Sequence, residues 1–193
     1  MTDIESTQQA SAQPRSLVPR RWPTLAGLGF AALIAFDLTS GVDLAPVLAA
    51  SAAVYLGAAA LQRPAAAWPL FFATAAVITV ARLLDDRFEP TWVILAGGVA
   101  LLVYGLLRGA GHPGHGLPLQ TVALLGFGAA AGAALMINPE IGAALVAAGL
   151  LGHAAWDAWH HRTSRVVVRS LAEFCLALDT ALAVVIVIVT MRR

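Results

Sequence analysis

The feature that most constrains this chain is a series of seven long apolar blocks, each separated from the next by a short polar break. The blocks cover approximately residues 24–40, 44–62, 65–84, 91–108, 118–137, 140–160 and 167–190. About 20 apolar residues, rising about 1.5 Å each in a helix, cross a hydrocarbon core about 30 Å thick. Backbone groups in lipid must be paired within their own segment, because no water is present to bind them. The pattern therefore predicts an all-α fold, a polytopic transmembrane helix bundle of about seven spanning helices.

The breaks and the composition agree with this fold class. Ser40-Gly41, Arg63-Pro64 and Asn138-Pro139 carry turn chemistry, and Pro139 suits the first turn of the sixth block. Only 12% of the residues are charged, against about 25% in soluble domains. Residues 1–22 are polar and rich in Gln, Ser and Pro, so we expect a disordered cytoplasmic N-terminal tail. Residues 23–193 are then the seven-helix transmembrane domain, with an uncleaved first span.

The distribution of arginine predicts the orientation of the bundle. With the N-terminus inside, eight arginines fall on the inner side and four on the outer side. The inner set is Arg15, Arg20, Arg21, Arg63, Arg108, Arg162, Arg165 and Arg169, and the outer set is Arg82, Arg87, Arg192 and Arg193. The excess of positive charge on cytoplasmic segments favours this orientation. We expect the bacterial inner membrane, which is the plasma membrane, with a cytoplasmic N-terminus.

The sixth and seventh blocks hold the only dense group of ionisable residues. His153, Asp157 and His160 are spaced i, i+4, i+7, which places them within about 60° of one another on a helix. The seventh block adds Arg169 and Glu173, which share a helix face, and Asp179. A charge at mid-membrane costs at least about 2.5–3.5 kcal/mol on insertion scales, so these side chains should face other helices. The sequence predicts a polar site there, on the inner-leaflet side.

Three interpretations of these residues stay open. His153, Asp157, His160 and Glu173 are ligand types that suit zinc, or iron held by two histidines and one carboxylate. The protein would then be a metal-dependent membrane enzyme. Alternatively, the histidines and carboxylates could form a path for protons or for a proton-coupled small solute. In the third interpretation, Asp157 and Glu173 pair with His153 and Arg169 and only lock two helices together.

Other residue types limit the function and the partners. Lysine is absent, which excludes a retinal Schiff base, and a net charge of +1 gives no basic tract for nucleic acid. Cys175 is the single cysteine, so no intrachain disulfide can form. The partner expected throughout is the lipid bilayer. Small residues such as Gly128 and Gly132 have the spacing of close helix contacts. They predict packing within the bundle or, alternatively, a homo-oligomer, and a role as an accessory or scaffold subunit of a membrane complex also stays open.

Overall fold

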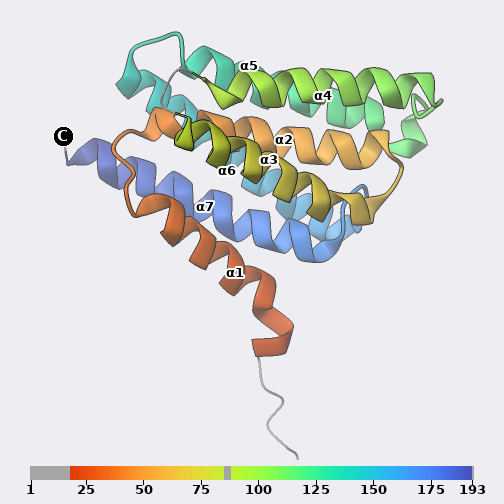
Figure 1. Cartoon of the computed structure of the whole chain (residues 1–193). Helices are drawn as coiled ribbons and strands as arrows, with labels where there is room; N and C mark the ends of the chain where they lie inside the picture. Colours follow the sequence, from red (N-terminus) through yellow and green to blue (C-terminus); the bar gives the residue numbers. More distant parts are fainter. Residues whose placement is uncertain (1–17, 85–87, 193) are drawn as a thin grey trace, which may run out of the picture.

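The chain folds into a bundle of helices that lie roughly side by side (Figure 1). The computed structural model describes residues 18–84 and 88–192, and within them it contains seven α-helices and no strands. The helices are α1 (Val18–Ala35), α2 (Ala45–Ala60), α3 (Ala67–Leu83), α4 (Pro90–Leu107), α5 (Leu117–Ala134), α6 (Pro139–Thr163) and α7 (Arg169–Met191). Each helix falls within or close to one predicted apolar block, so the all-α fold class is confirmed.

Six of the described helices, α2 to α7, are long and apolar enough to cross a membrane. The exception is α1, whose first turns contain Arg20 and Arg21 and whose backbone breaks at Arg21, just before Pro23. In Figure 1 this first part of α1 projects from the bundle. The predicted tail, residues 1–22, lies mostly outside the described residues, and the described chain is already helical from Val18.

Several helices begin at a proline or at a side-chain cap that suits a helix start. Pro90 and Pro139 stand in the first turns of α4 and α6, where a missing N–H costs no hydrogen bond. The Glu89 side chain accepts a hydrogen bond from the Thr91 N–H at 3.0 Å, and the Asn138 side chain accepts one from the Glu140 N–H at 2.9 Å. These caps satisfy backbone donors that the helix cannot pair internally. The prediction of Pro139 in the first turn of its helix is confirmed.

The short connections make neighbouring helices antiparallel, so the bundle has two chemically different ends. One end, called the acidic end below, carries Asp37, Asp43, Arg82 and Glu89. The other end, called the arginine end, carries Arg63, Arg108, Arg162, Arg165 and Arg169 between or beside the helix termini.

Helix α2 is the centre of the bundle. All of its residues are buried, and 89% of its spanning segment is covered by protein, against 11% for α3. Half of its residues are alanine. These small side chains let α3, α4 and α5 approach closely, which matters in lipid because apolar burial there does not drive helices together. The only polar side chains of α2 are Ser51 and Tyr55, which lie one turn apart. Because α2 is enclosed in this way, the side chains of Ser51 and Tyr55 face other helices and not lipid.

Glycines mark the closest approaches between helices. A Cβ atom added at Gly105 of α4 would lie 2.9 Å from the Cα of Ala60 on α2, while one added at Gly97 would meet nothing within 4 Å. Gly128 and Gly132 of α5 likewise face Leu95 and Trp92 of α4. The Gly128/Gly132 face is therefore used for packing within this bundle.

We expect Gly105→Leu to separate α2 from α4 and to cost about 1–3 kcal/mol or more, as overpacking does in well-packed cores. Gly97→Leu, on the same helix, should leave stability near the wild-type value because its side chain meets open space. Thermal unfolding of both variants in the same detergent measures the difference. Equal melting temperatures would mean that α2 and α4 do not meet at Gly105.

Candidate functional site

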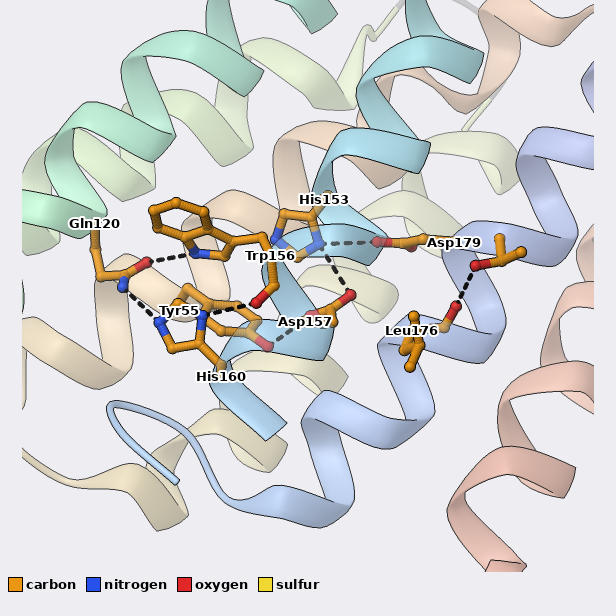
Figure 2. A network of polar contacts seen from close by, with 9 residues as sticks. Tyr55, Gln120, His153, Trp156, Asp157, His160, Leu176 and Asp179 are labelled. Carbon is orange, nitrogen blue, oxygen red and sulfur yellow. Dashed lines mark hydrogen bonds and ion pairs between the residues drawn. The ribbon is translucent and has the colours of Figure 1, made fainter. Parts of the chain in front are cut away.

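Three buried ionisable side chains from α6 and α7 meet inside the bundle (Figure 2). His153 Nδ1 lies 2.9 Å from Asp179 Oδ2 and 3.3 Å from Asp157 Oδ2. Asp157 follows His153 by four residues on α6, while Asp179 comes across from α7. All three residues are 0% exposed. We call His153, Asp157 and Asp179 the His–Asp centre.

Helix α2 supplies two neutral side chains that complete the surroundings of the His–Asp centre. The Tyr55 hydroxyl donates a hydrogen bond of 2.5 Å to Asp157 Oδ1, so it fixes the carboxylate oxygen that does not face His153. Ser51 lies one turn away from Tyr55 and beside the Asp179 carboxylate. The His153 ring packs edge-to-face against Tyr55 and Phe127, with ring centroids 5.2 Å apart in both pairs. Four helices, α2, α5, α6 and α7, therefore surround this centre.

His160 belongs to a separate hydrogen-bonded network. Its Nδ1 donates to the Trp156 carbonyl oxygen at 3.0 Å, which leaves Nε2 as an acceptor for the Gln120 amide nitrogen at 2.9 Å. The Gln120 oxygen in turn accepts from Trp156 Nε1 at 3.3 Å. These partners fix one neutral tautomer of His160, since one ring nitrogen must donate and the other must accept. The lone pair of its Nε2 is already used.

Glu173 and Arg169 lie apart from the His–Asp centre. Glu173 Oε1 accepts a hydrogen bond of 2.5 Å from the Thr24 hydroxyl of α1 and lies 3.6 Å from the Arg21 guanidinium. It lines another cavity, between α1, α6 and α7, together with His161 and Arg162. Arg169 donates from Nε to the His161 carbonyl oxygen at 3.1 Å. Of the six predicted site residues, His153, Asp157 and Asp179 meet, while His160, Arg169 and Glu173 bind elsewhere.

The charges of the His–Asp centre are not balanced by the protein side chains in contact with it. Within the described residues, the only ion-pair partner of Asp157 and of Asp179 is His153. With both carboxyl groups ionised, two carboxylates against one imidazolium would leave a net negative charge in an apolar core, where an unpaired charge is costly. Asp179 Oδ1 and His153 Nε2 also lack a hydrogen-bond partner among the described residues. An orphaned buried polar atom in a native structure calls for an explanation such as an ion.

The donor atoms of the His–Asp centre lie close enough together to be candidate ligands of a single metal ion. One imidazole nitrogen and two carboxylate oxygens lie within 4.8 Å of one another. Nitrogen and oxygen ligands of zinc lie about 2.0–2.2 Å from the ion, so two ligands of one ion are at most about 4.4 Å apart. The two contacts of His153 Nδ1, at 2.9 and 3.3 Å, are inside this limit. Two carboxylates with a neutral imidazole carry two negative charges, which a divalent cation would neutralise.

An apolar groove lies close to the His–Asp centre, although His153, Asp157 and Asp179 do not line it. The groove has a volume of about 250 Å³ and lies between α1, α2, α3 and α7. Ser51 and Cys175 are among its lining residues, and Cys175 stands one turn before Asp179 on α7. The groove thus comes within one side chain of Asp179.

Sequence reasoning named the ionisable residues but missed Tyr55, Ser51 and Gln120. Tyr55 and Ser51 are the only polar side chains of α2, and this isolation within an apolar span is the signal that could have found them. Gln120 stands in the second turn of α5, where an amide looks like part of the connection.

Comparison with protein-family models, with curated proteins and with solved structures finds no match for this chain. A proposal for its function therefore rests on the chemistry of the His–Asp centre and on the arrangement of the helices around it.

Proposed function

We propose that this protein is a metal-dependent membrane enzyme in which His153, Asp157 and Asp179 hold one divalent transition-metal ion. The observation that carries the proposal is the convergence of one imidazole nitrogen and two carboxylate oxygens, all buried, within 4.8 Å. A mixed nitrogen and oxygen ligand set suits zinc or ferrous iron. This set retains His153 and Asp157 from the sequence interpretation and takes Asp179 in place of His160 and Glu173.

The surrounding residues support a metal site rather than a simple helix lock. A lock made of ion pairs needs equal and opposite charges, whereas this centre has two carboxylates for one imidazole. Tyr55 holds the outer oxygen of Asp157 and so orients its inner oxygen toward His153. Partners of this kind, which bind the ligands and not the metal, fix ligand orientation in metalloproteins.

Three protein ligands leave coordination positions free for a reacting group. A divalent metal in such a site acts as a Lewis acid or activates a bound water. In this chain the groove beside Ser51 and Cys175 is the route by which an apolar molecule would come near Asp179. The protein's own residues contribute an apolar wall, a fixed Asp157 and the exclusion of bulk water.

Metal analysis of the purified chain tests the proposal. We expect about one zinc or iron ion per chain after purification in detergent without chelator, since three-ligand catalytic sites bind one ion. The retained ion should resist washing with a weak chelator because the site is buried. A chain that holds no metal and takes up none on titration would overturn the proposal. The buried charge would then be balanced by protons, which is the state that a proton-coupled carrier requires.

A further inference from the structure

The apolar groove continues into a polar cavity at the acidic end of the bundle. The polar cavity has a volume of about 460 Å³ and contains Asp37, Asp43, Arg82 and Glu89 among its lining residues. The groove itself is lined mainly by apolar side chains, such as Phe30, Ile34 and Phe71. Ile78 and Arg82 line both spaces, so the two adjoin. Together they form one amphipathic cleft, with a polar head region at the acidic end and an apolar tail region toward the bundle centre.

The length of the cleft matches one leaflet of a bilayer. Its lining residues on α3 run from Phe71 to Arg82, which corresponds to about 16 Å at the helical rise. Half of a hydrocarbon core of about 30 Å is about 15 Å. Helix α3 is mostly uncovered by protein, so the cleft has a wall that faces lipid directly. An acyl chain whose headgroup lies at the acidic end would follow this path.

The head region offers charges of both signs. Among the residues that the structure describes, Arg82 is its cation, and Asp37, Asp43 and Glu89 are its anions. Within the described part of the chain, no ion pair of 4.0 Å or less joins Arg82 to any of these carboxylates. Asp43 already accepts a hydrogen bond from the Ser40 N–H, and Glu89 caps α4. Arg82 and Asp37 are therefore the pair of opposite charges that can bind a ligand with both signs.

We propose that this cleft binds one phospholipid with a phosphoethanolamine headgroup. The phosphate binds the Arg82 guanidinium, which suits phosphate oxygens better than a point charge does. The primary ammonium donates hydrogen bonds to the Asp37 side of the head region, which a quaternary ammonium cannot do. One acyl chain follows α3 toward Ser51 and Cys175. A purely anionic headgroup is disfavoured, because it has no cationic group to offset the repulsion from the three carboxylates.

This lipid site stands on the cleft and its charges, and it does not depend on a metal in the His–Asp centre. The two proposals meet at Ser51, which lines the groove and lies beside Asp179. Metal content and lipid binding are measured separately, so either proposal can fail alone.

Native mass spectrometry of the delipidated full-length chain tests the lipid site. Added phosphatidylethanolamine should bind at least about tenfold more tightly than phosphatidylcholine or phosphatidylglycerol of the same acyl chains, the difference expected for one charged hydrogen bond. Asp37→Asn should remove this preference, whereas Arg82→Gln should weaken the binding of all three lipids, because each of them carries a phosphate. Equal binding of the three lipids to the wild type, or a preference that survives Asp37→Asn, would overturn the proposal.

A matched pair on α3 tests the tail region. Ala75 lines the groove, whereas Ala76, the next residue, is exposed and does not line it. Ala75→Phe should fill the groove and weaken phosphatidylethanolamine binding by about tenfold or more, the loss expected when the acyl chain's apolar burial is removed. Ala76→Phe should bind lipid as the wild type does. If both variants bind alike, the acyl chain does not occupy this groove.

Discussion

Replacing His153 by alanine or Asp179 by asparagine should remove the bound metal from the purified protein. His153→Ala deletes one of the three ligand atoms, and Asp179→Asn replaces a charged ligand by a neutral amide with almost no change of volume. Loss of a partner that only orients a ligand weakens metal binding by about 10–100-fold. Replacing a ligand itself should therefore weaken metal binding by more than that. Elemental analysis of the purified variants, with circular dichroism and gel filtration as measures of folding, provides the readout.

Two further substitutions serve as controls for metal loss. Glu173→Gln changes a carboxylate on the same helix as Asp179, but Glu173 binds Thr24 and Arg21 instead. His161→Ala changes a histidine at the end of α6 whose ring contacts the Arg169 carbonyl oxygen. Both controls should keep their metal. Metal loss in Glu173→Gln together with full retention in Asp179→Asn would contradict the assigned ligand set.

Tyr55→Phe should weaken metal binding by about 10–100-fold while the fold is kept, because the variant removes only the hydroxyl that orients Asp157. It also leaves Asp157 Oδ1 without its hydrogen bond, which costs about 1–3 kcal/mol when the atom stays buried. Competition with a fluorescent chelator measures the affinity, and thermal unfolding measures the stability.

Tyr104→Phe is the matched control for Tyr55→Phe. Tyr104 lies on α4 and is 45% exposed, so its hydroxyl contributes nothing to the centre. The metal affinity of the Tyr104→Phe variant should equal that of the wild type. Identical affinities in Tyr55→Phe and Tyr104→Phe would show that Asp157 needs no orienting partner.

The helices and their order could be predicted because lipid leaves the backbone few choices. Each apolar block had to be a helix, and the turn residues between blocks gave the ends to within a few residues. The structure differs from this prediction in one respect, which is whether α1 spans the membrane. Its arginines fall inside the helix, so it is not among the helices that are apolar enough to span.

The grouping of the polar residues depended on geometry that spacing alone does not give. His160 shares a helix face with His153, but seven residues separate them by about 10 Å along the axis, too far for one ion. Glu173 and Asp179 are six residues apart on α7 and therefore point about 120° apart. The face of α7 that meets α6 is set by the way α1 and α6 pack around α7, which spacing in the sequence does not reveal. In the structure, Gly27 of α1 packs against the backbone of α7 at Phe174, next to Glu173.

X-ray absorption spectroscopy of the purified wild-type chain tests the central claim most directly, since it reports the ligands of a bound metal. The His–Asp centre predicts a stoichiometric zinc or iron signal with nitrogen and oxygen ligands at about 2.0–2.2 Å and no sulfur at about 2.3 Å. The Asp179→Asn chain should give no such signal. A sulfur ligand, which only Cys175 or a methionine could supply, or a wild-type chain without metal, would contradict the account.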